Sequence, residues 1–217
     1  MVAGLTTETN ILGYVAAHPI PEVLRGINAF TLGARLVNPE AVVQVVWTGT
    51  WFDPAIEREA ANALLDAGAD VLGQHQDSPA TQLAAAERGA FGTGNNWDMI
   101  SMAPTATLTG PVWNWGPFYV ETLESIRENT WTNAQHWLPI PGIVDIGPFN
   151  DALVPADVQA TVMDKRQQII DGEFVVFAGP ITNQEGVVVV AEGQRMTDAE
   201  LLAMNWFVEG VIGEPAN

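Results

Sequence analysis

Four short loops of this chain carry aromatic and polar side chains where most turns need only glycine, asparagine or serine. The loops are His18-Pro19-Ile20-Pro21, Thr48-Gly49-Thr50-Trp51-Phe52-Asp53-Pro54, Gln74-His75-Gln76-Asp77-Ser78-Pro79 and Asn95-Asn96-Trp97-Asp98. Each one follows an apolar run and precedes a helical pattern, as a loop at the carboxyl end of a strand does. In an open α/β sheet such loops meet at one edge, where small ligands bind. Rings, carboxylates and amides together suit a flat ring that bears hydroxyls, which favours a binding protein over an enzyme.

The second loop holds two large rings at its apex, Trp51 and Phe52, outside any helix or strand stripe. Such rings could stack on a heterocycle, a contact that contributes on the order of 1–3 kcal/mol per base. They could equally fill the gap between the loop and the next helix. Asp53 also has two interpretations, because it could bond a ligand hydroxyl or cap the helix that Pro54 begins.

The third loop contains an H-x-D pair, His75 and Asp77, preceded by Gln74. We expect these side chains to form hydrogen bonds at a pocket rim, although Asp77 could simply assist the helix that begins at Ser78-Pro79. A metal site is not expected, since the chain has only 3 histidines, no cysteine and no E-x-x-H pattern. Phosphate-loop and G-x-S-x-G motifs are absent too, so no catalytic residue and no cofactor is predicted.

The elements that position these loops follow from periodicity. Apolar runs predict strands at residues 11–17, 41–47, 69–73 and 90–93. Helices are expected over 21–36, from Pro54 to about Gly68, and from Ser78-Pro79 to about Gly89, because proline suits the first helical turn and glycine follows the last. Repeated strand–helix units predict an α/β fold with a doubly wound parallel sheet.

Beyond residue 98 the pattern changes. One more strand is expected at 106–113, a short strand at 143–146, and helices at 118–127 and 155–171. Residues 175–177 and 187–190 are expected to pair as a hairpin across 182–186. Thr197 and Glu200 form a capping box that begins a last helix, 198–206.

The charge of the chain excludes several classes of partner. With 26 acidic and 8 basic residues the net charge is −18, which repels nucleic acid and anionic membranes and fits a salty or extracytoplasmic medium. There is no cysteine for a disulfide or a lipid anchor. Neither a signal peptide nor a membrane span is visible in this chain.

Several long segments of the chain resemble one family. GYVAAHPIPEVLRGINAFTLGAR, TWFDPAIEREAANALLDAGADVLGQHQDSPA, WNWGPFY and ELLAMNWFVEGVIGE are similar to the basic-membrane-protein (BMP) family of ABC-transporter substrate-binding lipoproteins, whose best understood relatives bind purine nucleosides. The resemblance implies a type I periplasmic-binding fold, in which two α/β lobes close on a ligand.

The resemblance also implies roles for individual residues. Phe52 or Trp51 would match a ring that stacks on the base. Asn96 falls where many relatives have an aspartate that contacts the ribose, Trp113 where nucleoside-binding relatives often have a lysine, and His18 where close relatives often have phenylalanine. A free purine base and a purine nucleoside both remain open as ligands. The complete set of expected ligand-binding residues is His18, Trp51, Phe52, Asp53, Gln74, His75, Asp77, Asn96, Asp98 and Trp113.

Family members carry a signal peptide, a lipidated cysteine and most of an amino-terminal lobe before the point that matches Met1. The resemblance therefore implies one complete lobe plus return segments of the second. We expect residues 1–105 to form the carboxyl-side lobe, 106–142 a crossover and partial amino-terminal-lobe segment, and 143–217 the return strands and helices. It further implies an extracytoplasmic, membrane-anchored location, with ABC permease subunits as partners and self-association through the incomplete lobe.

The favoured hypothesis is a non-enzymatic solute-binding component of an ABC importer. One alternative is a nucleoside-processing enzyme, a hydrolase or phosphorylase, in which Asp53, His75, Asp77 or Asp98 would be catalytic. Another is a ligand-sensing domain on the same scaffold. The absence of a phosphate-binding loop and of clustered acids around a metal argues against the enzyme.

Overall fold

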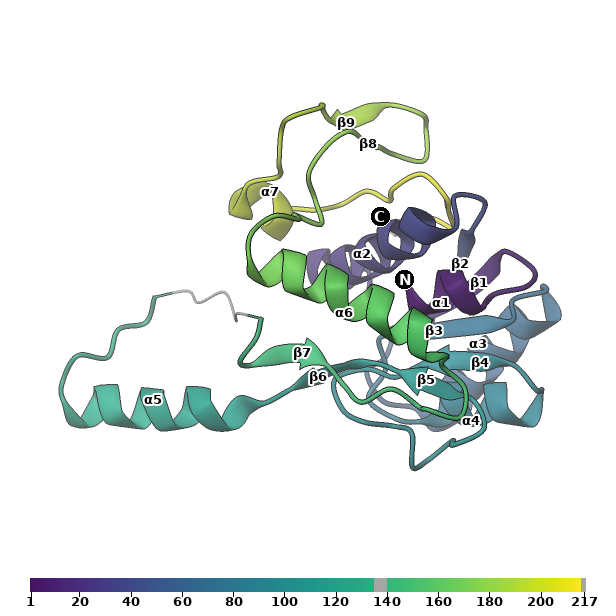
Figure 1. Ribbon diagram of the computed structural model, residues 1–217, viewed down its shortest axis with the longest axis horizontal. Coiled ribbons are helices and arrows are strands. Elements are labelled where there is room, and N and C mark those ends of the chain that lie inside the picture. The colour runs from purple at the N-terminus through teal and green to yellow at the C-terminus, as the bar shows by residue number, and fades with distance from the viewer. Residues whose placement is uncertain (135–139, 216–217) are drawn as a thin grey trace.

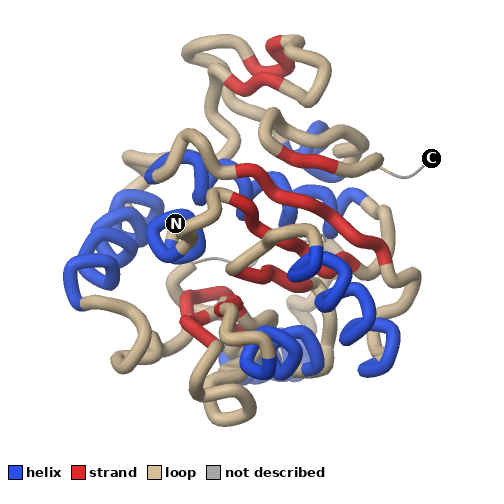
Figure 2. Tube along the Cα trace, turned by 90° about the vertical axis from the view of Figure 1, so that its right-hand side faces the viewer, coloured by secondary structure: helices blue, strands red, loops and turns tan. Residues whose placement is uncertain are grey.

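The computed structural model describes residues 1–134 and 140–215. Its centre is a six-stranded parallel sheet with strand order β10-β2-β1-β3-β4-β5. Helices lie on both sides of the strands (Figures 1 and 2). The sheet and its helices confirm the predicted α/β class with a parallel sheet.

The first four strands lie where periodicity placed them: β1 Ile11–Ala16, β2 Val42–Trp47, β3 Val71–Gln74 and β4 Phe91–Thr93. The helices between them are α2 Pro21–Val37, α3 Pro54–Asp66 and α4 Ala80–Glu87. Gly68, two residues beyond α3, has a φ of 98°, a conformation that favours glycine and ends the helix as predicted. Each loop rich in rings and polar groups therefore follows the carboxyl end of a parallel strand.

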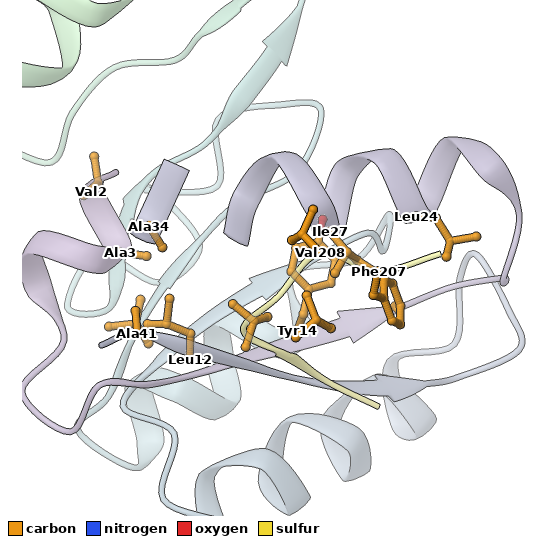
Figure 3. Packing of buried hydrophobic residues seen from close by; sticks show 14 of the residues in the cluster. Val2, Ala3, Leu12, Tyr14, Leu24, Ile27, Ala34, Ala41, Phe207 and Val208 are labelled. Atoms are coloured by element: carbon orange, nitrogen blue, oxygen red, sulfur yellow. The ribbon is translucent and has the colours of Figure 1, made fainter. Parts of the chain in front are cut away.

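Two apolar clusters cover the two faces of the sheet, as alternation along β1 requires. Leu12 and Tyr14 point to the face covered by α2, where Ile27 and the carboxyl-terminal Phe207 are fully buried (Figure 3). Val15 points to the opposite face, against α3 and α4. Because Phe207 belongs to this core, the end of the chain is an integral part of the lobe.

The strand expected at 106–113 is wrong, because it is two strands in two sheets. β5 Thr107–Thr109 pairs with β4, whereas β6 Pro111–Trp113 pairs antiparallel with β7 Val144–Ile146. Gly110 separates them, at a point where a Cβ would lie 2.7 Å from the carbonyl oxygen of Gly94. The chain leaves the main sheet at this close backbone approach, which apolar periodicity does not reveal.

The carboxyl-terminal third contains two further corrections. The hairpin pairs β8 Ile181–Thr182 with β9 Val188–Val190, and residues 175–177 take no part in it. The last helix, α7 Asp198–Leu202, has the predicted capping box but ends four residues early. Helix α6 Ala156–Ile170 agrees with expectation, whereas α1 Val2–Thr6 and β10 Val211–Ile212 were not predicted.

Helix α5, Trp115–Arg127, extends away from the rest of the molecule (Figure 1). It contains no buried residue. Tyr119, Leu123 and Ile126, spaced along one stripe, are each more than half exposed. The helix therefore presents an apolar face without an intramolecular partner among the described residues.

Candidate functional site

A row of rings crosses the carboxyl edge of the sheet. The ring of Trp51 lies between the rings of His18 and His75, with centroid distances of 5.1 and 6.0 Å and edge-on geometry. These residues follow β2, β1 and β3, so three of the predicted loops meet at this edge. Trp51 and Phe52 both remain exposed. Neither ring is buried in the core.

A cavity of about 510 Å³ opens beside this row. Such a volume lies within the range of about 300–1,000 Å³ typical of small-ligand pockets. Four of the predicted residues line it: Gln74, His75, Asn96 and Trp113. The backbone N–H of Trp113 donates to the carbonyl of Asn96 at 3.1 Å, which joins the crossover strand β6 to the loop after β4.

The other predicted residues lie outside the cavity wall. Asp53 caps α3, and its carboxylate accepts hydrogen bonds from the N–H groups of Ala55 and Ile56 at 3.0 and 3.2 Å. Asp98 accepts from the N–H of Ile100 at 2.9 Å, and Asp77 is exposed. Asp53 and Asp98 therefore use their carboxylates in local hydrogen bonds to the backbone, Asp53 at the start of α3 and Asp98 in the loop after β4.

Gln74 lines the cavity, but its side-chain amide forms hydrogen bonds with other protein groups. Its Nε2 donates to the carbonyls of Gln76 and Ser78, each at 2.9 Å, and its Oε1 accepts from Gln82 at 3.0 Å. The side chain thereby holds the third loop against α4. Because these hydrogen bonds fix its orientation, Gln74 gives this part of the cavity wall a fixed shape.

Sequence reasoning missed the wall that α2 contributes. Glu22, Arg25, Gly26 and Phe30 all line the cavity, and burial lowers the pKa of Arg25 while nearby Glu22 opposes that effect. Arg25 also donates to the carbonyl of Leu201 at 2.8 Å. The spacing of these residues along the start of α2 was the available signal, because i, i+3 and i+4 positions share one face.

Trp113 and Trp115 belong to different elements, β6 and α5. Trp113 lines the cavity, and Trp115 is the first residue of α5, where it stacks on Tyr119 at a centroid distance of 6.0 Å. Their own rings are 4.8 Å apart. The cavity wall is thus continuous with the aromatic start of α5.

Burial governs the charge of His75. It lowers the pKa of this imidazole from 6.5 to about 4, partly offset by the carboxylate of Asp77. The Nδ1 atom is buried without a hydrogen-bond partner among the described residues and lies against Gly26. His75 is therefore neutral at pH 7.

Acidification is expected to destabilise the fold through His75. The unfolded chain takes up the proton first, so the stability that neutral His75 contributes is complete above about pH 6.5 and is lost as the pH falls toward 4, about 3 kcal/mol in all. Urea unfolding at pH 7 and pH 4.5 measures this loss. Because pH 4.5 lies above the folded-state pKa of about 4, the loss between these two pH values should be smaller in the variant His75→Gln by about 2 kcal/mol, and equal losses in both proteins would contradict the assignment.

Among residues 1–134 and 140–215 there is no group of three or more histidine, cysteine, aspartate or glutamate side chains that could hold a metal ion. His136 lies outside the described residues. Within the same ranges, no helix is both long enough and apolar enough to cross a membrane.

A family model described as ABC transporter substrate-binding protein PnrA-like matches residues 1–178. The chain belongs to the Bmp family. Its similarity to a purine-binding protein of Brucella abortus is 39% identity over 212 residues, covering 97% of this chain and 60% of the relative. A Haloferax volcanii protein named as an ABC transporter glucose-binding protein is 42% identical, over 97% of this chain and 51% of the relative. Membership of the Bmp family confirms the resemblance read from the sequence.

Solved structures lead to the same fold. An ABC transporter solute-binding protein from Conexibacter woesei matches 80% of this chain and 59% of its own, with a TM-score of 0.63 and 26% identity. A solute-binding protein from Aeropyrum pernix shares the fold at a TM-score of 0.67 and 17% identity. This Bmp chain spans between half and two thirds of the length of these four proteins.

Proposed function

We propose that this chain is part of a non-enzymatic, extracytoplasmic solute-binding component of an ABC importer, and that its ligand is a purine nucleoside or purine base. The observation that carries the proposal is the cavity of about 510 Å³ at the carboxyl edge of the parallel sheet, which Trp113 and Asn96 both line. The purine-binding relative from Brucella abortus supports this choice of ligand.

The chemistry of the wall suits a heterocycle. The face of Trp113 offers a stacking surface, the amide of Asn96 offers both a donor and an acceptor, and neutral His75 adds no charge. Trp51 and Phe52 extend the apolar surface toward solvent, where a second lobe would close. The ligand would then be released to permease subunits without any bond being made or broken.

Binding of a purine is expected to depend on Trp113. Isothermal titration of the 217-residue chain with adenosine and with adenine should give saturable binding to at least one of them. Replacing Trp113 by alanine should weaken that binding by roughly 5- to 150-fold, the loss of one base–aromatic stack of about 1–3 kcal/mol. Trp131→Ala is the matched control, because Trp131 is exposed beyond α5 and away from the cavity.

Two outcomes would redirect the proposal. Saturable binding of glucose without binding of either purine would favour the ligand in the name of the Haloferax volcanii relative. Release of free hypoxanthine from inosine, abolished in His75→Gln, would favour the nucleoside-processing alternative. Binding of a purine with no release of base is the expected result.

We also infer that separate copies of the chain associate through the exposed face of α5. The face is made of large apolar side chains, each of which forgoes roughly 1.5–3 kcal/mol of burial while it faces water.

A further inference from the structure

Glu57 is a fully buried acidic residue in the first turns of α3. Its Oε1 accepts a hydrogen bond from the backbone N–H of Asp53 at 2.9 Å, and its Oε2 accepts one from the hydroxyl of Ser78. Burying a carboxylate is costly unless it is hydrogen-bonded, and here each oxygen has a donor. The two donors belong to different loops, one after β2 and the other after β3.

Two further contacts join the same pair of loops. The backbone N–H of Asp77 donates to the carbonyl of Trp51 at 3.0 Å, and the amide of the buried Gln76 donates to the hydroxyl of Thr48 at 2.8 Å. Ser78 also accepts from the N–H of Ala80 at 3.2 Å, which anchors it at the start of α4. Residues 48–54 and 75–78 are therefore linked at three points, one of them through the fully buried carboxylate of Glu57.

This linkage sets the position of the ring row. Trp51 contacts His18 and His75 edge-on, yet it is exposed on its outer side, so packing alone does not fix it. The carbonyl of Trp51 accepts a hydrogen bond from the backbone N–H of Asp77. The carboxylate of Glu57, in the first turn of α3, holds the end of the same loop through the backbone N–H of Asp53. Because His75 lines the cavity, the same bonds fix the cavity wall relative to Trp51.

We propose that Glu57 is a positioning residue that joins loops 48–54 and 75–78 into one preformed binding surface. Glu57 does not line the cavity, and it acts through the backbone of Asp53 and the hydroxyl of Ser78. The effect on ligand affinity rests on the proposed function, whereas the joining of the loops does not.

The test compares Glu57→Ala, Glu57→Gln and Ser78→Ala with the parent chain. Hydrogen exchange followed by mass spectrometry reports the loops, and titration with adenosine and adenine reports affinity. Glu59→Gln is the matched control, since Glu59 is exposed on the same helix. In Glu57→Ala the amides of 48–54 and 75–78 should exchange at least about tenfold faster, while those of β1 stay unchanged.

The two milder variants separate positioning from folding. Glutamine retains an acceptor for the Asp53 N–H and a polar partner for Ser78, so Glu57→Gln should restore loop exchange to within about threefold of the parent. Ser78→Ala should speed exchange in 75–78 more than in 53–54. Purine binding should weaken at least about fivefold in Glu57→Ala and recover in Glu57→Gln.

Loop exchange within about twofold of the parent in both Glu57→Ala and Ser78→Ala would overturn the proposal. Equal acceleration in the loops and in β1 would overturn it as well, because Glu57 would then support the whole lobe. If the parent binds no purine but the loops loosen selectively, the proposed function fails and the joining role stands.

Discussion

Raising sodium chloride from about 0.1 M to about 1 M is expected to raise the thermal midpoint of this chain by roughly 6–12 °C. The net charge of −18 repels itself across a small lobe, and added salt shortens the screening length from about 10 Å to about 3 Å. Ion pairs such as Arg35–Glu209 and Arg88–Asp66 join partly exposed side chains and neutralise only part of the acidic surplus. We expect a gain on the order of 3 kcal/mol, measured by differential scanning calorimetry.

A charge-reduced variant provides the control for the salt effect. Five exposed glutamates that make no ion pair among the described residues can be changed to glutamine, which moves the net charge from −18 to −13 (−18 + 5). The five are Glu59, Glu121, Glu124, Glu173 and Glu192. This variant should start from a higher midpoint at low salt and gain less from added salt. A parent midpoint that moves by less than about 2 °C would show that repulsion is unimportant.

Removing the apolar face of α5 is expected to convert an associating chain into a monomer. Leu123 and Ile126 are 66% and 53% exposed, and the double change Leu123→Gln with Ile126→Gln removes the centre of the stripe. When two α5 faces associate, the variant would lose about 3 kcal/mol of the free energy gained by burying these side chains, which would weaken association by more than about 100-fold. Light scattering after size-exclusion chromatography measures the mass, and association should strengthen in 1 M salt as repulsion is screened.

The control for this second prediction changes apolar residues of similar exposure elsewhere. Leu36→Gln with Val188→Gln alters side chains that are 48% and 58% exposed on α2 and β9, and it should leave association unchanged. A parent chain that runs as a single monomeric species at high concentration and high salt would refute association through α5.

Local sequence determined three strand–loop–helix units and the strand and loop of a fourth, whereas the helix expected after that fourth loop is absent among the described residues and the chain runs through turns to β5. Strand periodicity and the cap at Asp53 depend on contacts within a few residues, so they can be read directly from the chain. The same holds for the capping box at Thr197 and Glu200. Because parallel strands bring their following loops to one edge, the meeting of Trp51, His18 and His75 could also be predicted.

Only the tertiary structure decided which side chains share the cavity. Glu22 and Trp113 are 91 positions apart in the numbering, yet both line the cavity. The bond between Glu57 and Ser78 likewise joins residues from different βα units. Short-range patterns carry no information about such long-range contacts, because the contacts depend on how the elements are connected and packed and not on local composition.

The sequence by itself thus determined the parallel sheet, the edge at which the ring-bearing loops meet, and the family resemblance. The tertiary structure decided that Gln74 bonds inside the lobe and that α2 completes the cavity. The physical reason is that a polar side chain near a strand end has several partners within reach, and the packing of distant segments selects among them.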